Sequence, residues 1–389
     1  MMKDNKVIDK LQQDIVIPAI VQEKADLAFS RIQSERTDKT MHQRNRKWKT
    51  IWLPIAAAVL ALGTTVCAAV YFQWSKGLES QLQVTEEQKQ ILEETHVAAP
   101  VSNSVTEQGI TVTALQTIVD RRFAYLAFQV DGYDAEAGVQ PAFENTILEI
   151  DGKCDYDMLM AHFFNGLHLD EHGNFTYSDG SIAKENEDGS VIEKYADESG
   201  SMEYMILLMV PDQKDSFIGK PLHIELQNLG TVSKAEFTPD INATWSFDFT
   251  LQGSDKVRTC ELSEILGDSG ATVVEAEISP ISLHVSYDMP LQTKEIDGVD
   301  ESGGAIKSST FVEAPQLTGV RLKDGTLLTH LTNGGSEGYP DDSKQIYQAS
   351  YATTSVIEPE QVDALLFIKS YPEGNTPLTE ENLYIVPIK

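Results

Sequence analysis

Three histidines and two acidic residues lie close together in one stretch of the chain. His162, His168 and His172 follow one another at spacings of six and four, and Asp170 and Glu171 lie between the last two. Imidazole and carboxylate groups ligate zinc, but this stretch is rich in turn residues and holds no cysteine. Solvated loop histidines are the commoner result of such a pattern. We therefore assign no metal site and expect no cofactor.

A second candidate for chemistry is the run from Gly267 to Gly270, which contains Asp268 and Ser269. It resembles the nucleophile motif of chymotrypsin-like proteases, but no His and Asp follow in a matching order and frame. A turn between strands explains the run better. There is also no phosphate-binding loop and no dinucleotide fingerprint. We expect no enzyme. If Ser269 or His168 were catalytic, the Ser269→Ala or His168→Ala variant would lose activity.

The charge of the chain is distributed unevenly. The 389 residues carry a formal net charge of -30, yet residues 1–50 hold 11 Lys and Arg against 7 Asp and Glu, and the rest holds 19 against 53. Such an acidic bulk repels phosphates over about 10 Å, the Debye length at moderate salt. We therefore expect no direct binding of nucleic acid by the large portion of the protein.

An uncharged apolar run separates the basic end from the acidic bulk. Ile51 to Phe72 contains 22 residues without a charge, and as a helix it spans about 33 Å against a hydrocarbon core of about 30 Å. Trp48 and Trp52 lie at one end and Tyr71 and Trp74 at the other, where aromatic rings favour the membrane interface. We predict one transmembrane helix with its flanks over residues 47–74.

The orientation of this helix follows from the basic residues beside it. The residues that set the topology immediately precede the run: Arg44, Arg46, Lys47 and Lys49. Only Lys76 and Lys89 follow it closely, so the N-terminus should be cytoplasmic and the C-terminal bulk extracellular, at the plasma membrane. About 50 residues precede the run, which disfavours a cleaved signal peptide. Of the three cysteines, only Cys154 and Cys260 could then pair outside the cell, and the sequence leaves that pairing open.

Residues 1–46 form a short cytoplasmic helical segment that needs a partner. Pro18 separates two helical patterns. The second pattern carries an apolar stripe at helical spacing: Val21, Ala25, Ala28, Phe29 and Ile32. An isolated segment of this size cannot bury such a stripe. The stripe therefore predicts docking to a cytoplasmic protein, and the alternative is a partly disordered tail whose helix rests on the membrane surface.

The outer portion is predicted to be mainly β. Residues 75–106 are expected to form a helical stalk followed by a linker with Pro100. Residues 107–252 should form a first β-sandwich-like domain, with an elaborated insertion at 151–201, and residues 253–389 a second such domain. In the first, Trp245, Phe247 and Phe249 alternate with polar residues, which indicates a strand with one wet face. In the second, Asp324-Gly325 predicts a tight hairpin.

The whole layout resembles a family of bacterial single-pass membrane proteins built around a domain of unknown function of the DUF4179 type, described as anti-sigma-factor-like. Five stretches carry the resemblance: Ile17–Ile32, Ile51–Phe72, Gly109–Phe128, Leu322–Gly325 and Ile357–Val362. The C-terminal part is similar to the second β domain that often accompanies the first.

The resemblance implies a membrane-bound regulator. Its inner segment would hold an extracytoplasmic-function sigma factor inactive, and its outer domains would sense an envelope signal. The segment departs from zinc-type anti-sigma domains, since it has His42 and no cysteine. The rival hypothesis is an envelope binding or structural protein, in which the inner segment serves only to set topology.

Overall fold

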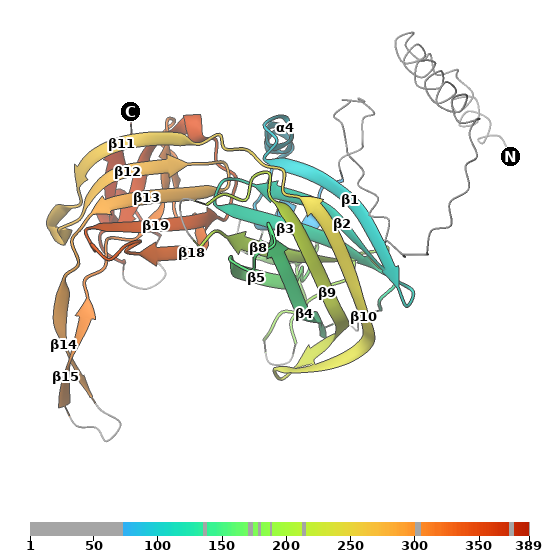
Figure 1. The fold of residues 1–389 in the computed structure, drawn as a ribbon. Coiled ribbons are helices and arrows are strands. Elements are labelled where there is room, and N and C mark those ends of the chain that lie inside the picture. Colours follow the sequence, from blue (N-terminus) through green and yellow to red (C-terminus); the bar gives the residue numbers. More distant parts are fainter. Residues whose placement is uncertain are drawn as a thin grey trace, which may run out of the picture. The chain divides into compact units, whose positions relative to one another are not determined.

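The computed structural model describes residues 73–134, 138–169, 174–177, 180–186, 189–211, 215–299, 305–372 and 377–388. The predicted cytoplasmic segment at 1–46 and the predicted span at 51–72 lie outside these residues. Within the described ranges, no helix has both the length and the apolar character needed to cross a bilayer. The described chain is mainly β, as the sequence predicts, and its strands pair in antiparallel sheets (Figure 1).

The strands before Gly253 form the first module, which is built around two facing sheets. Sheet A has the strand order β1-β2-β3-β8-β5, and sheet B has the order β10-β9-β4. A small third pair, β6 with β7, lies in the predicted insertion. The strands of this module are β1 (Ala98–Glu107), β2 (Ile110–Val119), β3 (Phe123–Asp131), β4 (Gln140–Ile150), β5 (Asp157–Phe163), β6 (Leu167–Leu169), β7 (Phe175–Tyr177), β8 (Met202–Met209), β9 (Pro221–Ser233) and β10 (Glu236–Thr250).

Sheets A and B pack face to face. Leu126 and Phe128 from sheet A meet Trp245 and Phe247 from sheet B in one core. The predicted alternation in β10 is confirmed, because Trp245 and Phe247 are buried whereas the polar residues between and after them are exposed. The indole N–H of Trp245 donates to the carbonyl of Ile110 at 3.1 Å, so this large side chain is buried without an unpaired polar atom.

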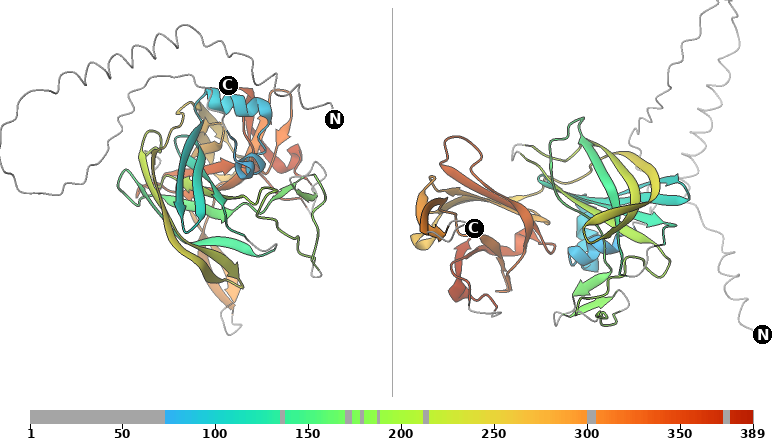
Figure 2. Two further views of the ribbon diagram at one scale, coloured as in Figure 1. Left: turned by 90° about the vertical axis from the view of Figure 1, so that its right-hand side faces the viewer. Right: turned by 90° about the horizontal axis from the view of Figure 1, so that it is seen from below.

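The other face of sheet A is covered as well. Two short helices, α3 (Lys76–Gln81) and α4 (Glu86–Glu94), lie beside the first module in both views of Figure 2. Their side chains Leu78, Leu82 and Leu92 are fully buried against Tyr125 and Met205 of sheet A. Burial on both faces explains why β3 and β8 are almost continuously apolar in sequence.

The helical structure predicted for this region is confirmed, but the helices pack on sheet A and do not form a separate stalk. A free stalk would expose its leucines, whereas the fold needs them to cover the sheet. The helix is also interrupted, because Gln83 has a positive φ of 46° and the chain turns before Thr85 caps α4. The helical segment is part of the first module.

The linker predicted at 98–106 is also wrong, since these residues form strand β1. Pro100 and the nearby serines led to that interpretation. A proline is tolerated here because β1 is an edge strand of sheet A and the register shifts between Pro100 and Asn103. The predicted insertion is corrected in part, because β5 pairs with β8 and belongs to sheet A.

The strands after Gly253 form the second module. Sheet C has the order β11-β12-β13-β19-β18, sheet D has β17-β16-β20-β21, and β14 with β15 makes a ribbon that projects from the module (Figure 1). The elements are β11 (Arg258–Ile265), η1 (Gly267–Ser269), β12 (Thr272–Ile278), β13 (Ser282–Asp288), β14 (Thr293–Val299), β15 (Ala305–Phe311), β16 (Leu317–Leu322), β17 (Leu327–Leu328), β18 (Thr332–Gly338), β19 (Ile346–Thr353), η2 (Pro359–Gln361), β20 (Val362–Ile368), η3 (Glu380–Asn382) and β21 (Leu383–Pro387).

Local sequence signals in the second module are confirmed. β16 and β17 pair across Asp324-Gly325, where Gly325 has a φ of +92° that favours glycine. Sheets C and D enclose a second core that contains Val285, Tyr287 and Phe367. One face of sheet C packs into that core, so its other face is left to meet the first module.

Candidate functional site

The chain enters the first module through a cluster of hydrogen bonds directly after the predicted membrane span. The carboxylate of Glu203 accepts from the hydroxyl of Ser75 at 2.5 Å and from the backbone N–H groups of Lys76 and Gly77 at 3.0 and 2.8 Å. The N–H of Ser75 itself donates to the side-chain oxygen of Gln116 at 2.7 Å. We call these five residues the anchor clamp. It fixes the first turn of α3 to β2 and β8.

Trp74 precedes the clamp and is held by α4. Its indole N–H donates to Glu93 at 2.6 Å, and the ammonium of Lys89 lies 5.8 Å from its ring centroid. The same ammonium bridges Glu79 of α3 at 2.8 Å and Glu86 of α4 at 2.6 Å, and these hydrogen bonds keep the pKa of Lys89 above its usual value although burial lowers it. The two helices are thus tied together at the start of the module.

A buried polar turn joins the two modules. Asp120 accepts from the N–H groups of Arg122 and Phe123, each at 2.8 Å, and from the hydroxyls of Ser279 and Ser282 in the second module. Its side chain is almost fully buried. A buried carboxylate is stable only when such donors surround it. Asp120 therefore makes the geometry of this turn depend on the second module.

Next to this turn, Arg122 forms an ion pair with Glu277 of β12. The Nη2 to Oε2 distance is 2.6 Å, and the two side chains are only 7% and 14% exposed. On the other side of the junction, the N–H of Val356 donates to the carbonyl of Leu82 at 3.1 Å, and the side-chain amide of Gln88 donates to the carbonyl of Val356 at 3.2 Å. The second module thus contacts the same helical segment that carries the anchor clamp.

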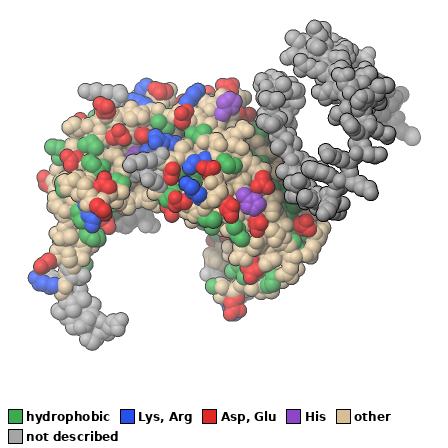
Figure 3. Space-filling view, in the orientation of Figure 1, with side chains coloured by type: hydrophobic (Ala, Val, Ile, Leu, Met, Phe, Trp, Pro, Cys, Tyr) green, Lys and Arg blue, Asp and Glu red, His purple; other side chains and the backbone are tan. Residues whose placement is uncertain are grey.

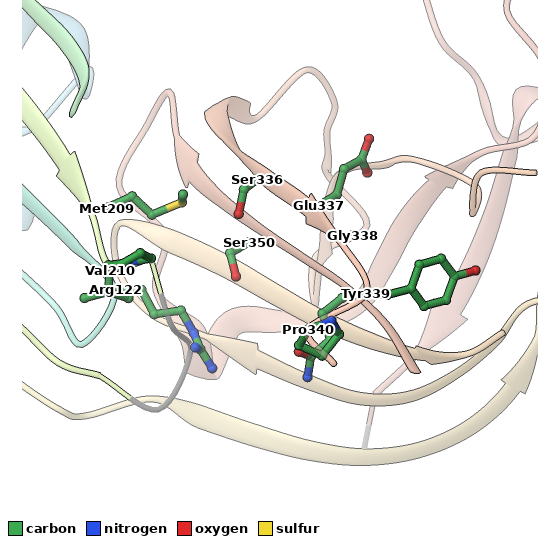
Figure 4. A pocket seen from close by; sticks show the side chains of 11 residues that line it. Arg122, Met209, Val210, Ser336, Glu337, Gly338, Tyr339, Pro340 and Ser350 are labelled. Carbon is green, nitrogen blue, oxygen red and sulfur yellow. The ribbon is translucent and has the colours of Figure 1, made fainter. Parts of the chain in front are cut away.

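Arg122 also lines a cavity of about 290 Å³ between the two modules, the junction cavity (Figure 4). Arg122, Met209 and Val210 from the first module and Ser336 and Ser350 from the second line it. The rest of its lining is Pro211, Glu337, Gly338, Tyr339, Pro340 and Gln348. Its volume is near the lower end of small-molecule sites, which begin at about 300 Å³.

The floor of the junction cavity continues into a chain of neutral hydrogen-bonding groups on sheet C. Gln348 donates to Ser286 at 3.1 Å, Ser286 lies 3.4 Å from Nε2 of His284, and Nδ1 of His284 lies 2.8 Å from the hydroxyl of Ser350. Burial, and to a smaller degree the charge of Arg122, lowers the pKa of His284 to about 3. The imidazole is therefore uncharged near neutral pH.

This low pKa decides what the Ser350–His284 pair can do. A general base works best when its pKa lies near the working pH, and an imidazole with a pKa of about 3 holds a proton too weakly to activate a serine. The arrangement instead offers hydroxyl, amide and imidazole groups as neutral donors and acceptors.

Most of the residues predicted from the sequence lie outside the described ranges. This applies to the stripe at 21–32, to the topology-setting residues at 44–49, and to Trp48, Trp52 and Tyr71. Trp74 is described and packs against the first module through its contacts with Glu93 and Lys89.

Of the other candidates raised by the sequence, Asp170, Glu171 and His172 lie outside the described residues. His162 lies in β5 and His168 in β6, and within the described residues no group of three His, Cys, Asp or Glu is placed to hold a metal. Ser269 lies in the turn η1. Cys154 is exposed and Cys260 is buried, and both are free thiols.

Sequence reasoning missed Glu203, Asp120, Arg122 and the polar floor. One signal was available, because Ser282, His284 and Ser286 alternate with apolar residues in β13, although that strand is almost entirely buried. Polar residues on a buried face indicate a specific polar contact. Nothing in the sequence links Glu203 to Ser75.

Comparison with known proteins gives little further information. No family model and no curated protein matches the chain. A solved structure of a conserved domain protein from Bacillus anthracis is similar at 12% identity with a TM-score of 0.37, over 76% of this chain and 87% of that chain.

Proposed function

We propose that this protein is a membrane-anchored regulator of the anti-sigma-factor type. Its cytoplasmic segment binds a sigma factor through the stripe at 21–32, residues 51–72 cross the bilayer, and the two β modules sense a signal outside the cell. Catalysis and cofactors play no part in this proposal.

The anchor clamp is the observation that carries the proposal. A protein that only displays a binding domain needs no more than a flexible tether beyond its membrane helix. Here the anchor clamp alone binds the first residues after the predicted span to the module through four hydrogen bonds, three of them to one carboxylate. A direct attachment of this kind supports signalling, because a shift of sheet A reaches the span instead of being absorbed by a linker.

The acidic surface supports the proposed location of the modules. Asp and Glu side chains are spread over the face shown in Figure 3, and they disfavour contact with nucleic acid and anionic lipid.

The proposed topology is tested by labelling the cysteines that the chain already contains. Cys154 is exposed and Cys260 is buried, so a membrane-impermeant maleimide should label intact cells at Cys154 only.

In this test the Cys154→Ser variant should lose the label. Labelling only after the cells are opened would contradict the proposed topology.

The sigma partner is tested by copurification with the full-length chain. The Phe29→Asp, Ile32→Asp double variant should fail to recover a sigma factor that the wild-type chain recovers, since two charges on the stripe prevent its burial. The matched control is Ser30→Asp, Ser34→Asp, which adds the same charge at positions outside the stripe. Failure of the wild-type chain to recover a sigma factor would refute the regulator and favour the envelope-binding rival.

A further inference from the structure

The junction cavity has the composition of a site for an uncharged polar ligand. Among the described residues that line it, the two charged side chains have partners, because Arg122 pairs with Glu277 at 2.6 Å and Glu337 accepts from the hydroxyl of Tyr351 at 2.7 Å. Figure 4 shows the Glu337 carboxylate directed away from the two serines. The two charges are thus each engaged within the protein, and the remaining lining offers neutral polar and apolar groups.

The two walls of the junction cavity differ in polarity. The second module supplies the neutral polar side chains of Ser336, Gln348 and Ser350, and the first module supplies Met209, Val210 and Pro211 next to the paired Arg122. A ligand that fits between such walls has hydroxyl or amide groups on one side and C–H groups on the other. A pyranose ring has this division, with an equatorial set of hydroxyls and an apolar face.

The hydroxyl of Ser350 is suited to meeting ligand hydroxyls. It is hydrogen-bonded to a neutral imidazole that has a second hydroxyl, from Ser286, on its other nitrogen. These contacts hold the Ser350 hydroxyl in place at the cavity, where it can form a hydrogen bond with a hydroxyl of the ligand.

We propose that the junction cavity binds an uncharged saccharide unit. The inference names the ligand class for the sensing role proposed above, and the effect of binding on signalling rests on that role. Binding of the saccharide itself does not depend on a sigma factor. The consequence follows from β8, which carries Met209 at the cavity and Glu203 in the anchor clamp. A ligand that draws the two modules together therefore acts on the strand that holds α3.

The test is a ligand-observed NMR titration of the purified full-length chain in nanodiscs, without any sugar-based detergent. The probes are the neutral trisaccharides chitotriose, which carries acetamide groups, and maltotriose, which does not. We expect saturable binding of at least one of them below about 10 mM, the range of weak specific sites. Absence of binding by both refutes the inference.

Two variants place the binding in the junction cavity. Ser336 is exposed at the rim, so Ser336→Trp fills the cavity without disturbing a core and should weaken binding at least tenfold, whereas Ser309→Trp on the exposed β15 strand is the matched control and should leave it unchanged. Ser350→Ala should weaken binding by about 3-fold to 10-fold, the effect of one neutral hydrogen bond. Both variants are checked for an unaltered thermal midpoint.

The outcomes separate the two proposals. Binding that Ser336→Trp leaves intact, or a preference for an anionic sugar such as a glucuronide, overturns the saccharide inference even when the sigma factor is recovered normally. Saccharide binding without recovery of a sigma factor supports the inference and refutes the regulator instead.

Discussion

Replacing Glu203 by glutamine should loosen α3 from the first module while leaving the shape of the side chain unchanged. The carboxylate accepts three hydrogen bonds, from the Ser75 hydroxyl and the N–H groups of Lys76 and Gly77. Glutamine keeps one acceptor oxygen. If the amide oxygen occupies the place of Oε2, it still accepts from Ser75 and Gly77. The amide nitrogen then occupies the place of Oε1, and because it is a donor, the N–H of Lys76 loses its acceptor.

The magnitude follows from the bonds that change. Two bonds pass from charged, worth about 1.5–3 kcal/mol each, to neutral, worth about 0.5–1.5 kcal/mol, and a third is lost. Glu203 is only partly buried, and solvent screening reduces these values. We expect the free energy of local opening at the start of α3 to fall by about 2 kcal/mol. This corresponds to about 30-fold faster amide exchange.

Hydrogen exchange with mass spectrometry measures this effect on a peptide covering residues 73–82 of the full-length chain. Glu198→Gln is the control, since Glu198 is exposed and acts on Lys76 only through its charge. Protection should fall in Glu203→Gln and persist in Glu198→Gln. Equal protection in the wild type and Glu203→Gln, within about threefold, would refute the clamp and remove the argument for direct coupling to the membrane span. An equal loss in both variants would attribute the effect to net charge.

Two further predictions concern the junction. Arg122→Ala should lower the free energy of unfolding by about 2–3 kcal/mol, because it leaves the partly buried Glu277 with only the guanidinium of Arg121, at 4.0 Å. Urea titration of this variant, of Glu277→Ala and of the double variant should give a non-additive cycle, and additive losses would argue against the ion pair. Acidification should destabilise the protein through His284, whose pKa falls from 6.5 to about 3 on folding. The unfolded chain binds the proton near pH 6.5 and the folded chain only near pH 3, so the stability that neutral His284 contributes is complete above pH 6.5 and is lost as the pH falls. The free energy of unfolding should decrease by about 2 kcal/mol between pH 7 and pH 5. Urea titrations at the two pH values should show that loss in the wild type and not in His284→Gln, and an equal loss in both would refute the assignment.

Local patterns predicted the local structure well. The period-two pattern of β10 and the Asp324-Gly325 hairpin are both present, because each depends on residues that are neighbours in sequence. The mainly β fold follows from the same signals. The candidates for metal binding and catalysis were set aside on their spacing alone.

The segment between the predicted span and β2 could not be predicted in the same way. Its leucines fit an exposed stalk or a covering layer equally well, and only the presence of an apolar outer face on sheet A selects the second. Strand β1 was hidden by Pro100 and its serines, since an edge position that tolerates proline is known only once the sheet order is known.

The sequence by itself determined the β content, the uneven charge and the uncharged run at 51–72, since these are properties of composition and of short-range periodicity. The tertiary structure decided the anchor clamp and the junction. Ser75 and Glu203 are 128 positions apart, and Asp120 and Ser282 are 162 apart. No local pattern encodes such pairs. They form because sheet A buries both faces, and the polar groups that this burial removes from water must find partners in whatever part of the chain the fold brings beside them.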